Sequence, residues 1–132
     1  HFTKMVHNGI EYGLMQAYAE GFSILKHKQE FGLDLAQVAE IWRYGSVVCS
    51  WLLDLAADAL KKNPQMDGVA PYVVDSGEGR WTVEAAIEVS VSAPVITLSL
   101  MERYRSRDDD SFADKLLSSL RNEFGGHAIK KE

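Results

Sequence analysis

The sequence has little cysteine: one residue in 132, so no disulfide can form within the chain. This excludes the small secreted folds that depend on disulfides and fits a reducing compartment, so we expect a cytoplasmic protein. Cys49 lies in an apolar run and has no histidine or second cysteine at a suitable spacing beside it. It is therefore predicted to be a small core residue and not a nucleophile.

Long apolar runs and excess positive charge are also missing. No run of about 18 apolar residues occurs, so no membrane span or membrane partner is expected. No secretory leader is visible, although a chain that begins with His1 is expected to lack its natural N-terminus. The net charge of −5 argues against a nucleic-acid partner, which would require a basic stripe. With 46% hydrophobic residues, residues 1–132 are expected to form a single domain.

The sequence also lacks a complete dinucleotide-binding fingerprint. Residues Val73 to Gly79 imitate a strand that leads into a glycine-rich turn, but the third glycine is absent and no alternation of strands and helices surrounds it. No nucleotide-binding domain is therefore predicted within this chain.

Helical periodicity covers most of the sequence and predicts an all-α fold of about six helices around a long N-terminal one. Asp34 is placed to cap the second helix, and Ser111 with Asp114 resembles a capping box for the sixth. The expected helices cover Thr3 to Lys28, Leu35 to Gly45, Ser46 to Lys62, Thr82 to Val91, Pro94 to Arg105, and a segment that follows Ser111 and ends near Phe124.

The first helix concentrates polar groups that its fold does not require. At 100° per residue, one narrow arc carries Lys4, His7, Asn8 and Glu11, and the opposite arc, expected to pack, carries Val6, Ile10, Gly13, Ala17 and Ile24. Lys4 and Glu11 are about 10 Å apart along the axis, a gap that could hold a small polyol. A plain solvated face is the alternative, but helix-weakening Gly9 and Gly13 suggest a close approach to the backbone. His7 and Glu11 alone do not make a metal site, and no metal is expected.

Three motifs carry a resemblance to a known family: Lys4 to Gly13 (KMVHNGIEYG), Gly77 to Thr82 (GEGRWT) and Arg121 to His127 (RNEFGGH). In this order they resemble the decarboxylating 6-phosphogluconate dehydrogenases, and Ile41 to Gly45 (IWRYG) is similar to a weaker family segment. The resemblance covers nearly the whole chain. It implies the C-terminal, helical, substrate-binding and dimerising domain of a short-form enzyme, without its N-terminal nucleotide-binding domain.

The resemblance implies the reaction and the roles of the polar arc. The whole enzyme would oxidise 6-phosphogluconate with NAD or NADP and release ribulose 5-phosphate and CO2 in the pentose phosphate pathway. Lys4 would be the general base, Glu11 the general acid, and His7 and Asn8 would hold substrate oxygens. The residues that choose between NAD and NADP would lie in the missing domain, so the isolated chain should be inactive.

The resemblance also implies a phosphate site. Arg103 falls where the family has a phosphate-binding arginine, and the neighbouring Arg105 and Arg107 do not. Tyr12 would add a hydroxyl. Larger members have a phosphate-binding lysine where this chain has Ser76, so either affinity is lower or Arg80 compensates.

The tail residues Arg121 and His127 match an arginine and a histidine that, in this family, enter the active site of the neighbouring subunit. An intertwined homodimer with composite sites is therefore expected. Two alternatives remain open: the helical domain of a related β-hydroxyacid dehydrogenase of the 3-hydroxyisobutyrate type, and a noncatalytic helical dimerisation module.

Overall fold

A computed structural model describes residues 1–132, and every element in it is helical, as predicted. None of the helices combines the length and apolarity that a membrane span requires. The elements are α1 (Phe2–His27), η1 (Gln29–Phe31), α2 (Leu35–Gly45), α3 (Trp51–Lys62), α4 (Glu78–Glu88), α5 (Pro94–Ser106) and α6 (Phe112–Gly125).

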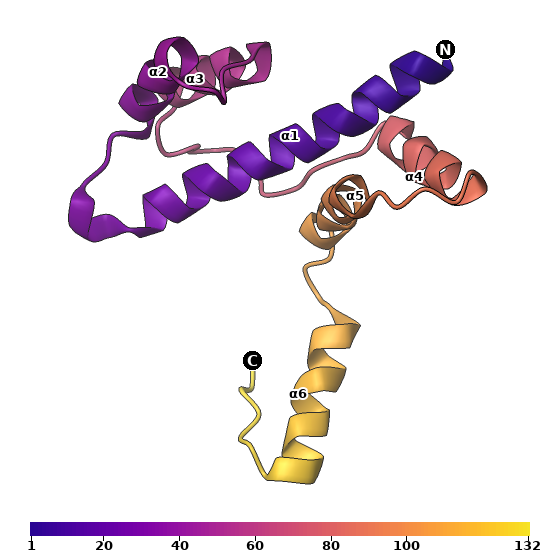
Figure 1. Ribbon diagram of the computed structural model, residues 1–132. Coiled ribbons are helices and arrows are strands. Elements are labelled where there is room, and N and C mark those ends of the chain that lie inside the picture. Colours follow the sequence, from indigo (N-terminus) through magenta and orange to yellow (C-terminus); the bar gives the residue numbers. More distant parts are fainter.

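Helix α1 is the spine of the molecule, and the other helices attach to it in two groups (Figure 1). The α2–α3 hairpin packs beside its C-terminal half, and α4 and α5 pack beside its N-terminal half. The connection from Asn63 to Gly77 runs back along α1 between the two groups, and α6 projects away from the rest (Figure 1). The two ends of α1 therefore have different neighbours.

The α2–α3 group holds the apolar core. Phe22 from α1 packs with Ala39 from α2 and with Leu53, Ala57 and Leu60 from α3. The Asp34 carboxylate caps α2 as predicted, since it accepts hydrogen bonds from the backbone N–H groups of Ala36 and Gln37. The α2–α3 hairpin is therefore held to α1 by an apolar cluster to which all three helices contribute.

The third helix begins at Trp51 and not at Ser46 as predicted. Residues 46–50 are not helical because their hydroxyl groups have other partners: Ser46 Oγ donates to Trp42 O, and Ser50 Oγ caps α3 through the N–H of Leu53. Tyr18 Oη of α1 donates a hydrogen bond of 2.6 Å to Val48 O and so holds residues 46–50 against α1. Cys49 is exposed in this segment, so its prediction as a core residue was wrong.

The fourth helix also differs from its prediction, since it covers Glu78–Glu88 and not Thr82 to Val91. Gly77 has a φ of 100°, which a residue with a side chain rarely adopts, and this turn starts α4 one turn earlier. At the other end, Ser90 has a φ of 57° and lies outside the helix. The GEGRWT motif therefore forms the first turn of a helix and not the loop before one.

Candidate functional site

The polar arc of α1, defined as Lys4, His7, Asn8 and Glu11, lies together on the exposed side of the N-terminal half of this helix. His7 Nδ1 lies 3.0 Å from Asn8 Oδ1, which accepts its hydrogen bond when Nδ1 carries the proton. The same nitrogen lies 4.0 Å from Glu11 Oε2. Lys4 is exposed and makes no hydrogen bond or ion pair. His7 thus lies close to both Asn8 and Glu11, whereas Lys4 has no partner.

The orientation of this arc is set by α4. Met5, Gly9, Tyr12 and Gly13 are the buried residues of this half of α1. Thr82 Oγ1 of α4 donates to Met5 O at 2.9 Å, and a Cβ on Gly9 would lie only 2.5 Å from Thr82 Cγ2. The predicted close approach to the α1 backbone is therefore confirmed, and α4 is the element that makes it.

The predicted packing arc was only partly right. Gly13 is buried, but Ile10 is 52% exposed and Ile24 is 71% exposed. The helix turns the small residues and Tyr12 towards α4 and α5, because only small side chains allow such a close helix contact. At 100° per residue, Asn8 lies about 40° from Tyr12 at the edge of the packed face, so groups from α5 and the preceding loop can reach this edge of the polar arc.

The structure brings three residues of the predicted phosphate end together. The Arg103 guanidinium stacks 3.6 Å above the centre of the Tyr12 ring, and Tyr12 Oη accepts a hydrogen bond from Ser76 N at 3.2 Å. Arg103 Nη1 donates to Val74 O at 2.9 Å, and Nη2 lies 4.0 Å from Met15 Sδ. No carboxylate pairs with Arg103, so its positive charge is available to an anion.

Arg103 also lies in line with the polar arc. At 100° per residue, the directions of Tyr12 and Met15 on the α1 wheel fall on either side of the direction of Asn8. The Arg103 guanidinium contacts both Tyr12 and Met15, so it lies over the same side of α1 as Asn8, one turn further along the helix from Lys4 and Asn8. The axial rise from Lys4 to Tyr12 is about 12 Å.

The other two arginines of this region already have partners. Arg80 donates to Tyr104 Oη at 3.0 Å and pairs with Asp75 at 3.1 Å, and Arg107 pairs with Asp75 at 3.2 Å. The hydrogen bond to Tyr104 and the charge of Asp75 raise the pKa of Arg80 above its usual value. Sequence reasoning missed Asp75, because a loop aspartate beside a serine carries no signal of its own.

Arg121 and His127 are not brought to this site by their own chain. Both lie at the far end of α6, which stands apart from α1 (Figure 1). Gly126 ends α6 with a φ of 63°, and Asn122 Nδ2 donates to His127 O at 2.9 Å. The tail is thus folded back on the end of α6, with its arginine and histidine both exposed.

The glycines of the incomplete fingerprint allow close packing at the start of α4. A Cβ on Gly79 would lie 2.4 Å from the Tyr12 ring, and one on Gly77 would lie 3.0 Å from Trp81. Glycine at these two positions therefore lets Tyr12 and Trp81 lie directly against the backbone.

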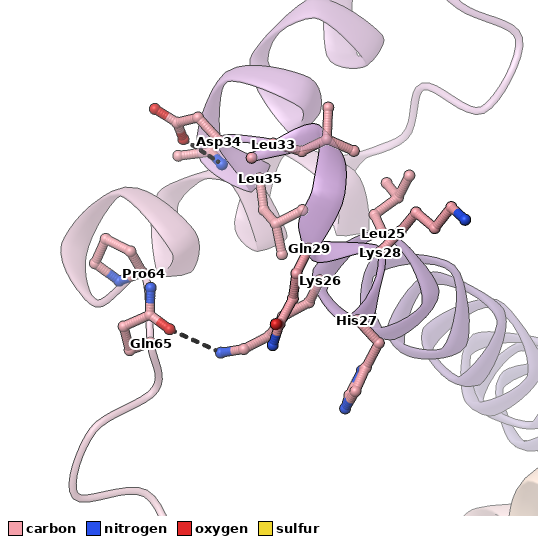
Figure 2. Close-up of a pocket in the computed structure, with 12 residues that line it drawn as sticks. Leu25, Lys26, His27, Lys28, Gln29, Leu33, Asp34, Leu35, Pro64 and Gln65 are labelled. Carbon is pink, nitrogen blue, oxygen red and sulfur yellow. Dashed lines mark hydrogen bonds between the residues drawn. The ribbon is translucent and has the colours of Figure 1, made fainter.

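A cavity of about 460 Å³ lies at the opposite end of α1 from the polar arc and is lined by Leu25 to Gln29, Gly32 to Ala36, Pro64 and Gln65. Figure 2 shows Lys26 pointing to Gln65, whose Oε1 accepts its hydrogen bond at 2.9 Å. Lys28 pairs with Glu30. With these two lysines engaged, the cavity offers less to an anion than the free Arg103 does.

Comparison with known proteins gives a consistent result. The family described as "6-phosphogluconate dehydrogenase, C-terminal domain" matches residues 1–131. The Bacillus subtilis (strain 168) protein YqeC, whose name places it among the 6-phosphogluconate dehydrogenases, is 50% identical over 132 residues. An NAD(+)-dependent, decarboxylating 6-phosphogluconate dehydrogenase of Haloferax volcanii is 44% identical over 133 residues, and a decarboxylating one of Lactococcus lactis subsp. cremoris is 38% identical over 146.

All three alignments cover 100% of this chain but only 44%, 44% and 29% of the relatives. The chain therefore spans less than half the length of these relatives. Its helical fold and the match over residues 1–131 agree with each other and with the three motifs. The chain belongs to the 6-phosphogluconate dehydrogenase family, in which it corresponds to the C-terminal domain.

Proposed function

We propose that this chain is the substrate-binding and dimerising domain of an enzyme that oxidatively decarboxylates 6-phosphogluconate to ribulose 5-phosphate. The observation that carries the proposal is the alignment of the free Arg103 guanidinium with the polar arc of α1. A guanidinium offers a fixed fork of donors to phosphate oxygens. The phosphate would lie at Arg103 and Tyr12, and the carbon chain would lie over the polar arc of α1.

The chemistry follows from the residue types on the arc. Lys4 takes the proton of the C3 hydroxyl while C3 is oxidised, and the resulting ammonium then donates a hydrogen bond to the C3 carbonyl oxygen. That bond favours loss of the C1 carboxylate as CO2, because it stabilises the developing enediol. Glu11 protonates the carbon that becomes C1 of the product. His7 and Asn8 bind the hydroxyl groups between these two sites.

The hydride acceptor would come from outside this chain. A nicotinamide, NAD or NADP, held by another domain of the enzyme would accept the hydride from C3. Lys4 and His7 are exposed, so this chain would form only one wall of the substrate site. The upstream domain would supply the second wall, exclude water and lower the polarity around Lys4.

The partner of this domain would be a second copy of the same chain. A compact monomer of 14.7 kDa exposes about 6,900 Å², whereas this chain exposes 10066 Å². Along the C-terminal half of α1, two apolar grooves of about 490 and 510 Å³ flank Tyr18 and Phe22. Helix α6 exposes Phe112, Leu116, Leu117, Leu120 and Phe124. Such surfaces suit an intertwined dimer in which Arg121 and His127 reach the partner's site.

Calorimetry on the complete enzyme tests this function. We expect 6-phosphogluconate to bind, and Arg103→Gln to weaken its binding about 10- to 100-fold because a charge-assisted contact to phosphate is lost. The matched control is Arg105→Gln, since Arg105 lies on the same helix and only approaches Asp114 at the surface, at 3.6 Å. Equal effects of the two variants would contradict the phosphate site. Preferential binding of 3-hydroxyisobutyrate would favour the related β-hydroxyacid dehydrogenases.

A further inference from the structure

We propose that Asp75 is a positioning residue for the phosphate end of the substrate site. Its carboxylate anchors the strap, defined as residues Val73 to Ser76, on α5, and so fixes the backbone groups that orient Arg103 and Tyr12. This inference rests on the proposed function, because it concerns the same phosphate site. It assigns a role to a residue that would not itself contact the substrate.

The first observation is the burial and pairing of the Asp75 side chain. It is only 2% exposed, although it lies in a connection between helices. Arg80 Nη2 donates to both of its oxygens, at 3.1 Å to Oδ2 and 3.4 Å to Oδ1, and Oδ1 also accepts from Arg107 Nη1 at 3.2 Å. A carboxylate this buried requires such partners, because an unpaired charge in this environment would be strongly unfavourable.

The second observation is the sequence position of Asp75 between two functional backbone groups. The residue before it, Val74, provides the carbonyl that accepts from Arg103 Nη1 at 2.9 Å. The residue after it, Ser76, provides the N–H that donates to Tyr12 Oη at 3.2 Å. Both groups that hold the stacked Arg103–Tyr12 pair are thus adjacent in sequence to the buried carboxylate, so a displacement of Asp75 would shift both.

The third observation is that the start of the strap is also attached to α5. Val73 N donates to Ser106 Oγ at 2.9 Å, and Ser106 Oγ in turn donates to Arg103 O at 2.7 Å. Each of the four strap residues is therefore bonded to a helix or to the residue that ends one, and Asp75 has two such partners. Among these contacts only that of Asp75 is ionic, and it joins the strap to α4 through Arg80 and to the C-terminal end of α5 through Arg107.

Asp75 also determines which arginine is free. It pairs with both Arg80 and Arg107, whereas Arg103 faces a carbonyl and an aromatic ring but no carboxylate. If Asp75 served only to balance charge, removing its negative charge would strengthen phosphate binding. If Asp75 positions the strap, the same change would weaken phosphate binding, because Arg103 would lose its fixed orientation.

The test compares Asp75→Asn with the parent in the complete enzyme, using two ligands that differ only in the phosphate. We expect the Kd of 6-phosphogluconate to rise at least tenfold and the Kd of gluconate to change less than twofold. The KM should rise more than kcat falls, since an interaction with a remote group of the substrate is lost. Hydrogen exchange at the amides of Val73 and Ser76 should become faster. Asp54→Asn is the control, because Asp54 pairs with Arg43 in the α2–α3 hairpin.

Arg107→Gln keeps the test decisive if Asp75→Asn does not fold. It removes the contact of Asp75 with α5 and leaves that with Arg80, so it should reproduce the loss of 6-phosphogluconate affinity. An unchanged or lower Kd for 6-phosphogluconate in these variants would overturn the positioning role. A parent enzyme that does not prefer 6-phosphogluconate to gluconate would instead contradict the phosphate site itself, so the two failures can be distinguished.

Discussion

Lys4 and Arg103 are the two free cations at the ends of the candidate site, and they have different surroundings. Arg103 is stacked on Tyr12 and bonded to Val74 O, so its guanidinium has a defined position. Lys4 has no partner in this chain and is exposed. A fixed guanidinium suits binding of a phosphate, whereas the Lys4 amine has no carboxylate partner and, in its neutral form, can accept the substrate proton and later return it.

At the residue scale we predict that Lys4→Ala in the complete enzyme lowers kcat about 10²- to 10⁴-fold, the usual contribution of a general base. Stability should change little, because Lys4 packs against nothing in this chain. The measurement is the initial rate of 6-phosphogluconate oxidation together with a thermal unfolding curve. Lys61→Ala removes an equally exposed lysine at the end of α3 and should leave the rate unchanged. A Lys4→Ala rate within a few-fold of the parent would place the base elsewhere.

At the scale of elements, the contact between α1 and α4 decides how the site is presented. The two helices meet through Gly9 on one and Gly79 on the other, which face Thr82 and Tyr12 respectively. This contact turns Lys4, Asn8 and Glu11 away from the interface. A larger residue at either glycine would separate the helices and rotate the arc relative to Arg103.

We predict that Gly9→Ala destabilises the fold by about 1 to 3 kcal/mol, because a Cβ would lie within 2.8 Å of three Thr82 atoms. Gly45→Ala at the end of α2 meets no atom within 4 Å and should stabilise the fold by up to about 1 kcal/mol. Chemical unfolding followed by circular dichroism measures both. The double variant Gly9→Ala/Thr82→Ala should recover part of the loss. If it does not, the contact with Thr82 is not the cause.

At the scale of the whole molecule, α6 has almost no contact with the rest of its own chain. An isolated amphipathic helix with this much exposed apolar surface gains stability only by packing on something else. The two apolar grooves beside α1 offer such a surface on a second copy. In that arrangement, each site contains residues from both chains, and dimerisation is required for catalysis.

A complementation experiment tests this arrangement. Inactive Lys4→Ala subunits mixed with inactive His127→Ala subunits should form heterodimers with one intact site each, with Lys4 from one chain and His127 from the other. Random pairing predicts recovery of about a quarter of the parent activity. As a control, Lys4→Ala subunits mixed with the double variant Lys4→Ala/His127→Ala should stay inactive. No recovery despite heterodimers confirmed by mass would mean that the tail serves its own subunit or no site.

The sequence alone determined the all-helical class, the caps at Asp34 and Ser111, and the polar arc of α1. These features depend on residues a few positions apart, whose spacing sets both helix formation and the side chains that share a face. The motif resemblance favours Arg103 over Arg105 and Arg107 as the phosphate residue, which stays a prediction. The local sequence pattern was sufficient to predict these features because the interacting groups belong to one helix.

Only the tertiary structure decided which face of α1 packs, where α3 and α4 begin, and which arginine remains free. Ile10 and Ile24 are apolar yet exposed, because the close contact with α4 requires glycine and so determines the rotation of α1. Asp75 meets Arg107, 32 positions away, across a connection without periodicity. Such contacts depend on the path of the chain in space, since a residue's neighbours in sequence do not specify which distant charge it will meet.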